Sequence, residues 1–338
     1  MKAFLITNPG ATELGNVSKP APGPGDLLLR TRYIGLCGTD LNTFRGTNPM
    51  VTYPRIPGHE IAATIVDAGA NVPSHFQFGT DVTVSPYTSC GTCASCLRGR
   101  TNACMSNQTL GVQRDGAMQE YFTVPWQKAF VANGLSLREL TLVEPLGVGF
   151  HTVSRARVTN TDTVAVIGCG AVGLGAVAAA AFRGADTVII DIDDAKLAIA
   201  KQAGAHHAIN SRSEDVHTRL QELTNGHGPD VIIEAVGLPA TYRMAIEEVA
   251  FTGRVVYVGY AKEPVTYETK YFVQKELDIL GSRNSLDEFP DVIAMLLQGR
   301  FPVEATVSRV VPLHQAGEAL AGWADAPQTI TKILVELS

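Results

Sequence analysis

The chain has 338 residues, of which 45% are hydrophobic and 18% charged, a composition typical of globular proteins. This length favours two domains. The formal net charge is −6 and Lys and Arg form no cluster, which argues against binding to nucleic acid or to an anionic membrane. Residues 1–7 read as a first strand and lack the long apolar core of a signal peptide.

The first part of the chain, residues 1 to about 145, is predicted to be rich in β-structure with little helix. Short β-type runs at 26–34, 60–66 and 81–84 are separated by segments that contain Gly and Pro. The Pro- and Gly-rich stretch 20–25 marks a turn.

Four cysteines follow within fifteen residues, at a C-x2-C-x2-C-x7-C spacing: Cys90, Cys93, Cys96 and Cys104. Such intervals allow four sulfurs to surround one ion, as in closed structural zinc sites. The alternative, a pair of disulfides, belongs to small secreted chains. The spacing therefore predicts a structural zinc and a reducing, cytoplasmic location.

From about residue 150, strand-like and helix-like segments alternate, which predicts a doubly wound parallel sheet. The predicted strands are 163–167, 187–191, 231–234, 254–258 and 277–280, and the predicted helices are 194–203, 240–249 and 289–298. Short strands are expected from there to the carboxyl end, the last at 333–337, with this tail rejoining the first domain. The uncharged stretch 164–182 reads as strand, glycine turn and helix rather than as a membrane span.

The glycine turn lies between a strand and a helix and has the pattern G-x-G-x-x-G, at Gly168, Gly170 and Gly173. Its glycines permit a tight turn, close approach of a pyrophosphate and close helix packing, and the helix N-terminus attracts phosphate. Alone the pattern is weak, but this context predicts a dinucleotide site. Its candidate residues in and around the turn are Gly168, Gly170, Val172, Gly173, Asp191 and Lys196.

Asp191 lies eighteen residues after Gly173, at the end of the next predicted strand. A carboxylate there accepts hydrogen bonds from the adenosine ribose hydroxyls and repels a 2′-phosphate. Asp193 and Asp194 add negative charge, so the sequence predicts NAD rather than NADP. The alternative role for such an acid, capping the next helix, suits Asp193 better.

A second set of candidate metal ligands is predicted on three separated loops, at Cys37, His59, Glu60 and Glu144. Singly, each has an ordinary structural explanation, such as core packing for Cys37 or a solvated loop for Glu144. Together they offer sulfur, nitrogen and oxygen, as a catalytic zinc with one open position requires. Because a strand points successive side chains to opposite faces, joint binding by His59 and Glu60 needs a bend near Gly58.

These motifs resemble those of the zinc-dependent medium-chain alcohol dehydrogenases, and within them the sorbitol and hexonate (sugar-acid) dehydrogenase branch. The resemblance covers essentially the whole chain and rests on motifs in the family's order: Cys37-Gly-Thr-Asp, Gly58-His-Glu, the four cysteines, Asp115-Gly, Glu144-Pro-Leu and the glycine turn. It implies a GroES-like, β-rich catalytic domain (1–148 and 288–338) and a Rossmann domain (149–287). It also implies one catalytic and one structural zinc per chain, with NAD as cosubstrate.

The resemblance implies that Cys37 and His59 bind the catalytic zinc, and that Glu60 and Glu144 complete the site directly or through water. Thr39 would take the substrate proton and Asp40 would orient His59. Many relatives carry a His five residues after the ligand Cys, where this chain has Asn42, so the proton relay must end in a ribose hydroxyl and water, or in another group. Asn cannot act as a base near neutral pH.

The activity that this resemblance implies is oxidation of a secondary alcohol of a polyol or sugar acid to a ketone. The resemblance also implies that Val258, Gly259, Ser282 and Arg283 contact the cofactor, and that the stretch 281–284 contacts the nicotinamide and a polar substrate. Arg283 would in addition bind a substrate carboxylate or, equally, backbone carbonyls. The alternatives are an amino-alcohol oxidation like that of L-threonine 3-dehydrogenase, and a non-enzymatic zinc-ribbon protein, against which the second ligand set argues. A homo-oligomer, dimer or tetramer, is expected, with a small-molecule substrate and no nucleic-acid or membrane partner.

Overall fold

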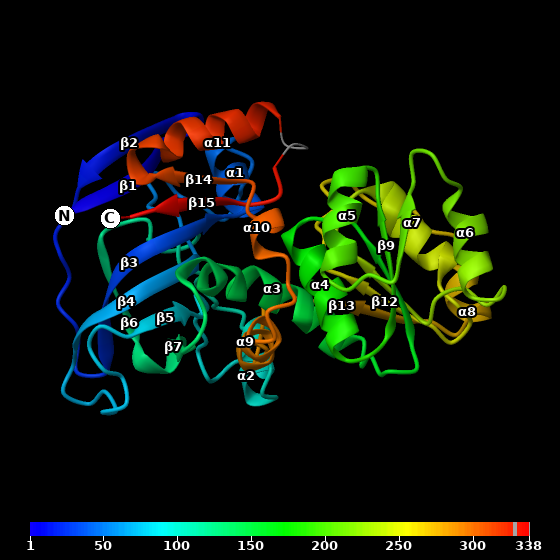
Figure 1. The fold of residues 1–338 in the computed structure, drawn as a ribbon, viewed down its shortest axis with the longest axis horizontal. Helices are drawn as coiled ribbons and strands as arrows, with labels where there is room; N and C mark the ends of the chain where they lie inside the picture. Colours follow the sequence, from blue (N-terminus) through cyan, green and yellow to red (C-terminus); the bar gives the residue numbers. More distant parts are fainter. Residues whose placement is uncertain (327–329, 338) are drawn as a thin grey trace. The chain divides into compact units, whose positions relative to one another are not determined.

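The computed structural model describes residues 1–326 and 330–337. The chain forms two compact units, of which the first comprises residues 1–144 and 303–338 and the second residues 145–302. We call them unit 1 and unit 2. The chain leaves unit 1 and returns to it, as the sequence colours of Figure 1 show.

Unit 1 is built on a sheet in which β14, β15, β3, β4, β5 and β7 are neighbours in that order, and β6 also pairs with β3. A separate hairpin pairs β1 with β2. The strands of unit 1 are β1 (Lys2–Asn8), β2 (Ala11–Asn16), β3 (Asp26–Leu36), β4 (Glu60–Ala68), β5 (Asp81–Val84), β6 (Tyr121–Pro125), β7 (Ala129–Val131), β14 (Arg309–Pro312) and β15 (Ile333–Glu336). Its helices are α1 (Gly38–Phe44), α2 (Ala94–Leu97), α10 (Val303–Thr306) and α11 (Ala316–Asp325), with 3-10 turns η1 (Thr101–Ala103), η2 (Trp126–Lys128) and η3 (Leu313–Gln315).

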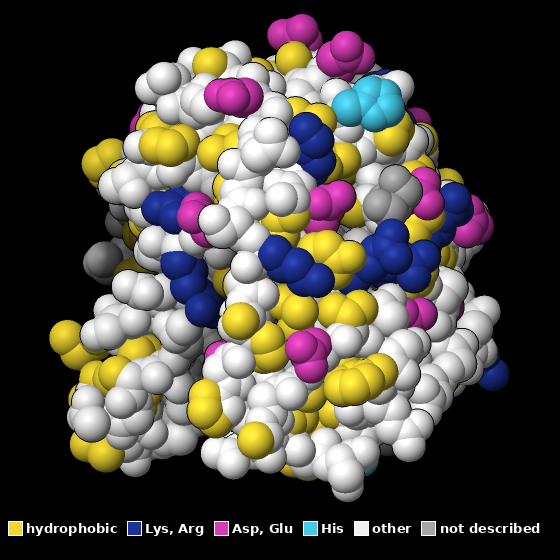
Figure 2. Space-filling model, turned by 90° about the vertical axis from the view of Figure 1, so that its left-hand side faces the viewer, with side chains coloured by type: hydrophobic (Ala, Val, Ile, Leu, Met, Phe, Trp, Pro, Cys, Tyr) yellow, Lys and Arg dark blue, Asp and Glu magenta, His cyan; other side chains and the backbone are white. Residues whose placement is uncertain are grey.

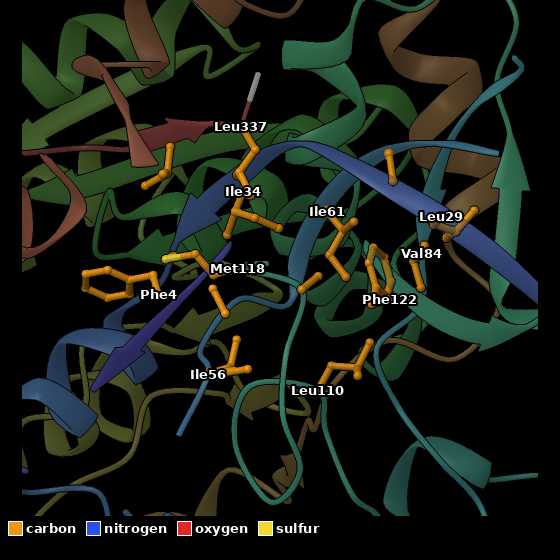
Figure 3. Packing of buried hydrophobic residues seen from close by; sticks show 14 of the residues in the cluster. Phe4, Leu29, Ile34, Ile56, Ile61, Val84, Leu110, Met118, Phe122 and Leu337 are labelled. Carbon is orange, nitrogen blue, oxygen red and sulfur yellow. The ribbon is translucent and has the colours of Figure 1, made fainter. Parts of the chain in front are cut away.

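The core of unit 1 is a cluster of buried apolar side chains from the strands of this sheet and the segments packed against them (Figure 3). Leu29 and Ile34 of β3 and Ile61 of β4 are fully buried, and they pack with Met118 and Phe122. Burying such side chains contributes about 1.5–3 kcal/mol each. This core holds β3 and β4 rigidly side by side, which fixes the residues at their ends.

Unit 2 contains a six-stranded, wholly parallel sheet in the order β10-β9-β8-β11-β12-β13. This is the strand order of dinucleotide-binding doubly wound folds. The strands are β8 (Thr163–Ile167), β9 (Asp186–Asp191), β10 (His207–Asn210), β11 (Val231–Glu234), β12 (Arg254–Tyr257) and β13 (Asp278–Gly281), and the helices are α4 (Ala171–Phe182), α5 (Asp194–Gln202), α6 (Val216–Leu223), α7 (Pro239–Glu248), α8 (Lys270–Gln274) and α9 (Phe289–Leu296). α4 and α5 pack on β8–β10 and α7 packs on β11 and β12 (Figure 1). The central strands β8 and β11 are accordingly buried, and they are apolar except for Thr163 and Glu234 at their ends.

The predicted strands of unit 2 and its α/β alternation are confirmed, with ends that differ by one residue at most. Two local predictions are wrong. Glu144 does not lie in a loop but inside α3 (Leu137–Arg155), a helix that tolerates Pro145 and joins the two units. The segment after α9 is not made of strands alone, because α11 forms over 316–325 and buries Ala316, Ala319 and Leu320.

The division between the units also differs from the expected one, which assigned residues 288–302 to the first domain. In the structure these residues belong to unit 2. The reason is local packing: Glu288 lies 2.7 Å from the ring nitrogen Nδ1 of His151, and the Phe289 ring lies against Gly147 of α3.

Figure 2 shows one face of the molecule, where Lys and Arg side chains are interspersed with acidic and hydrophobic ones. Within residues 1–326 and 330–337, no helix has both the length and the apolar character needed to cross a bilayer. The uncharged stretch 164–182 is divided into β8, the glycine turn and α4, as predicted.

Candidate active site

Unit 1 brings three of the four predicted catalytic metal ligands together. Ligand atoms of Cys37, His59 and Glu60 all lie within 4.8 Å of one another. Cys37 follows β3 directly and begins α1, and Glu60 begins β4 opposite Gly35 of β3. The end of β3 and the start of its antiparallel neighbour β4 lie side by side, so sulfur, nitrogen and oxygen ligands meet at the same end of these two strands. This ligand set fits a divalent metal of the zinc type.

The predicted bend before His59 is present. Gly58 has a φ of +102°, a conformation that favours glycine. A Cβ atom there would lie 3.0 Å from the Met118 backbone nitrogen and from a methyl group of Ile34. The glycine therefore allows the chain to turn into β4, so that His59 and Glu60 reach the same cluster instead of opposite faces.

His59 is oriented toward Asp40, whose Oδ1 lies 3.9 Å from the ring nitrogen Nδ1. Both atoms are buried and have no hydrogen-bond partner among the described residues. The other oxygen of Asp40 accepts the Cys37 backbone N–H at 2.9 Å. Burial lowers the pKa of His59, but the charges of Asp40 and Cys37 outweigh it and raise that pKa well above the usual value. A buried imidazole whose Nδ1 lacks a hydrogen-bond partner, beside a thiol and two carboxylates, fits metal binding.

Glu60 has a cationic partner that the sequence analysis did not identify. The Lys332 ammonium donates to both carboxylate oxygens, at 2.6 and 2.7 Å, and both side chains are almost fully buried. Burial lowers the pKa of Lys332. The charges of Glu60 and Cys37 raise this pKa by more than burial lowers it, so that it lies above its usual value. Lys332 is therefore a charged group in the core of the site.

Glu144 is buried nearby in unit 1 but lies outside the group of mutually close ligand atoms. Its carboxylate accepts the hydroxyl hydrogen of Tyr87. Burial raises the pKa of Glu144 to about 7, and burial together with the charge of Glu144 raises that of Tyr87 well above its usual value. The structure thus separates the two glutamates: Glu60 lies with Cys37 and His59, and Glu144 lies with Tyr87.

The hydroxyl of Thr39, in the first turn of α1, lies 3.7 Å from the Cys37 sulfur. Asn42 lies one turn further along, where its side-chain oxygen accepts the hydroxyl hydrogen of Thr47. Thr39 is thus the predicted proton-transfer residue that adjoins the ligand cluster, and Asn42 is engaged elsewhere.

The four cysteines of the predicted structural site converge as expected. Their sulfurs lie within 4.8 Å of one another, and none forms a disulfide. The Ser95 hydroxyl and the Cys96 backbone N–H lower the pKa of Cys93 to about 5. Four free thiols at this spacing, with one already favouring the thiolate, fit a closed zinc site.

The glycine turn of unit 2 has the geometry of a dinucleotide cradle. Gly168 has a φ of +99°, and a Cβ at Gly173 would lie only 1.8 Å from the Gly168 carbonyl oxygen. A Cβ at Gly170 would meet nothing within 4 Å, so this residue borders open space at the start of α4. The turn is tight where the chain packs on itself and open where phosphates approach.

Asp191 lies at the end of β9 and points back to this turn. Its Oδ2 accepts the Cys169 backbone N–H at 2.6 Å, and its Oδ1 accepts those of Ile192 and Asp193 at 2.7 and 3.2 Å. Asp193 caps α5 by accepting from Ala195 and Lys196, as predicted. Asp191 therefore both shapes the turn and keeps a carboxylate beside it.

The remaining predicted cofactor residues border the same carboxyl edge of the parallel sheet, where such sheets bind ligands. Val258 and Gly259 donate to the Glu234 carbonyl at 3.0 and 3.1 Å, and Ser282 donates to that of Tyr257 at 2.9 Å. Arg283 follows β13 and is exposed on unit 2. Val172 and Lys196 lie in the first turns of α4 and α5.

Three residues of these sites were missed from sequence: Tyr87, Lys332 and Glu234. Glu234 ends β11 and accepts from Val236, Gly237 and the Thr241 hydroxyl at 2.7–2.9 Å. The sequence could have indicated Glu234, because it is the one charged residue of the otherwise apolar strand 231–234. Lys332, directly before the last strand, is a weaker indication of a site residue, and no pattern in the sequence indicates Tyr87.

Two family models match the chain. Residues 23–133 match the alcohol dehydrogenase GroES-like domain, and residues 171–298 match the zinc-binding dehydrogenase model. Sorbitol dehydrogenase of Bacillus subtilis is 32% identical over 95% of this chain and 92% of its own. L-galactonate-5-dehydrogenase of Escherichia coli is 31% identical over 88% of each chain.

A solved structure agrees over the full length. The crystal structure of an alcohol dehydrogenase from Escherichia coli CFT073, complexed with NADH, has a TM-score of 0.92 and 29% identity and covers 100% of this chain and 99% of that one. With its GroES-like unit, its parallel dinucleotide fold and its two ligand clusters, the chain belongs to the zinc-type medium-chain alcohol dehydrogenases and is an NAD(P)-dependent oxidoreductase of that family.

Proposed function

We propose that the protein oxidises a secondary alcohol of a polyol or sugar acid to a ketone and transfers the hydride to NAD. The observation that carries this proposal is the cluster of Cys37, His59 and Glu60 in unit 1, in which a carboxylate accompanies a single thiol. The similarity to sorbitol and galactonate dehydrogenases supports the choice of substrate class.

Cys37 and His59 would hold a catalytic zinc, with Glu60 or Glu144 as the carboxylate, and the four cysteines would hold a structural one. Zinc supplies a Lewis acid that lowers the pKa of an alcohol. Thr39, whose hydroxyl lies 3.7 Å from the Cys37 sulfur, would accept the substrate proton, and Asp40, 3.9 Å from the His59 ring nitrogen Nδ1, would orient the imidazole. We count two zincs per chain because the ligand sets share no residue.

The NAD preference follows from Asp191, whose carboxylate adjoins the glycine turn. A ribose with free hydroxyls can donate to it, while a 2′-phosphate meets its negative charge and that of Asp193 and Asp194. Arg283, exposed at the end of β13, is our candidate for contact with the cofactor or with a substrate carboxylate.

The test is a substrate panel with NAD and with NADP, read by absorbance of the reduced cofactor, combined with zinc analysis. We expect polyols or sugar acids to be oxidised and about two zincs per chain. His59→Ala should abolish turnover but retain NAD binding, since the dinucleotide residues belong to unit 2. Preferred oxidation of L-threonine would instead support the amino-alcohol alternative. Zinc without turnover on any alcohol would support a binding protein.

We also propose a homo-oligomer, a dimer or a tetramer. Unit 2 exposes several large apolar side chains, among them Phe251, Val273 and Ile279, and these are our candidates for a contact between subunits. Light scattering on the purified protein gives the mass directly, and a monomer at all concentrations would contradict this proposal.

A further inference from the structure

Lys332 reaches the candidate catalytic site from the far end of the chain. β15 pairs antiparallel with β3, with Ile333 opposite Leu36, so that the residue before β15 lies beside the end of β3. The ammonium donates to both oxygens of Glu60, at 2.6 and 2.7 Å, and to the Leu36 carbonyl at 3.2 Å. Three donors meet three acceptors, so this side chain is fully satisfied in a buried position.

Glu60 consequently faces two partners. One of its oxygens lies within 4.8 Å of ligand atoms of both Cys37 and His59, while Lys332 grips both oxygens. A buried carboxylate requires a counter-charge or it becomes neutral. Here the chain supplies the counter-charge itself, and the carboxylate is stabilised whether or not it also contacts a metal.

The ion pair of Lys332 with Glu60 affects how strongly Glu60 can bind a metal. A thiolate at Cys37 and a carboxylate at Glu60 would together neutralise a divalent ion. The buried ammonium of Lys332, 2.6 and 2.7 Å from the Glu60 oxygens, is a second cation that shares the negative charge of this carboxylate. It also withdraws electron density from Glu60, which makes that carboxylate a weaker ligand.

We propose that Lys332 is a positioning residue that competes with the catalytic metal for the carboxylate of Glu60, so that Glu60 is a weak ligand and one coordination position stays available to substrate. This inference rests on the metal site proposed above. It predicts that removing Lys332 raises the affinity for the metal, whereas removing a residue that supports a metal ligand ordinarily lowers this affinity.

The test uses Lys332→Met, which keeps an unbranched side chain one heavy atom shorter and removes its charge. The zinc is exchanged for Co²⁺, and its release to a chelator is followed in the full-length protein. His59→Ala supplies the baseline for metal at the four cysteines. We expect release from the catalytic site to slow by about tenfold or more, as for loss of one buried charge near a divalent ion. The d–d absorption bands of Co²⁺ should shift as the carboxylate moves onto the metal.

Two further variants decide whether the effect passes through Glu60. Lys332→Arg retains the charge and should release metal within about threefold of the wild-type rate, in line with ordinary scatter among substitutions. In a Glu60→Gln background, Lys332→Met should have a much smaller effect than in the wild type. An equal effect in both backgrounds would overturn the proposal, because Lys332 would then act on the metal directly.

Other outcomes are equally decisive. Unchanged or faster release from Lys332→Met, with unshifted bands, would refute competition for Glu60. If Lys332→Met does not fold, Lys332→Gln, which keeps a donor but no charge, carries the same expectation. Wild-type protein that binds no metal beyond the His59→Ala baseline would refute the metal site itself, a failure distinct from that of this inference.

Discussion

Gly35 and Glu60 face each other across β3 and β4, and a Cβ atom at Gly35 would lie 2.0 Å from the Glu60 carboxylate oxygen Oε2. The glycine therefore gives the carboxylate the space in which it reaches Lys332, Cys37 and His59. Gly35 lacks a positive φ, so its role is one of space rather than of backbone conformation.

Gly35→Ala should displace Glu60 and weaken the binding of the catalytic metal by about 10–100-fold, the usual cost of disturbing the support of a metal ligand. Metal titration with a competing chelator measures this. Gly25→Ala is the matched control, because a Cβ there meets nothing within 4 Å. Equal metal affinity in both variants would show that the crowding at Gly35 is relieved without moving Glu60.

Thr39→Val removes the hydroxyl beside Cys37 and keeps the shape of the side chain. We expect kcat to fall by about 10²–10⁴-fold, the range for loss of general acid–base help. Activity should partly recover at high pH, where hydroxide takes the proton. Asn42→Ala should change kcat little, since Asn42 is engaged with Thr47, and Asn42→His should broaden the pH optimum. A wild-type pH–rate profile in Thr39→Val would mean that the proton leaves by another route.

Asp191→Ala should weaken NAD binding by about 10–100-fold, because a hydrogen bond to a charged group is worth about 1.5–3 kcal/mol. The ratio of kcat/KM for NAD to that for NADP is the informative measurement. The substitution also removes the acceptor of the Cys169 backbone N–H, which should weaken the binding of NAD and NADP alike. The loss of repulsion between Asp191 and the 2′-phosphate favours NADP alone, so only this loss brings the two kcat/KM values closer together. A wild-type enzyme that prefers NADP would contradict the argument from this carboxylate.

Cys93→Ser should lower the zinc content by about one per chain and reduce the melting temperature, because a closed zinc site contributes folding free energy. Cys169→Ser is the control for metal content, since Cys169 is buried in the glycine turn, outside both ligand clusters. Two zincs in Cys93→Ser would show that the four thiols are not the structural site.

Glu288→Gln tests the buried contact with His151 that attaches α9 to α3. Burial raises the pKa of Glu288, but the hydrogen bonds from His151 and from the Leu286 backbone outweigh it, and the net pKa is lowered. A carboxyl group whose pKa is lower in the folded state stabilises the fold above its unfolded pKa of about 4.3 and loses this effect as the pH falls through the folded pKa.

At pH 7 the free energy of unfolding of Glu288→Gln should therefore lie about 1–3 kcal/mol below that of the wild type. The difference should shrink as the pH falls below about 4, where the wild-type carboxyl becomes protonated. Denaturant unfolding at a series of pH values measures it. Glu304→Gln, which affects an exposed pair with Arg138, should be nearly neutral. A pH-independent difference for Glu288→Gln would indicate lost packing rather than lost charge.

Local spacing in the sequence was sufficient to predict the four-cysteine cluster, the dinucleotide turn and the strands of unit 2. Cys90, Cys93, Cys96 and Cys104 converge because the short intervals leave their sulfurs few other arrangements. The glycine turn and Asp191 meet because neighbouring parallel strands end at the same edge. The apolar runs of unit 2 form strands because such segments are buried on both faces of the sheet.

Tertiary structure alone decided which groups accompany the catalytic ligands. Lys332 lies 272 residues from Glu60 in sequence, and Tyr87 lies 57 residues from Glu144. No periodicity relates such positions, since their contact depends on which strand pairs with β3 and on how α3 packs. The glutamates have similar sequence signals, yet one pairs with an ammonium and the other with a phenol. Burial makes those partners decisive, because a carboxylate removed from water takes its charge and its orientation from the groups that the fold places beside it.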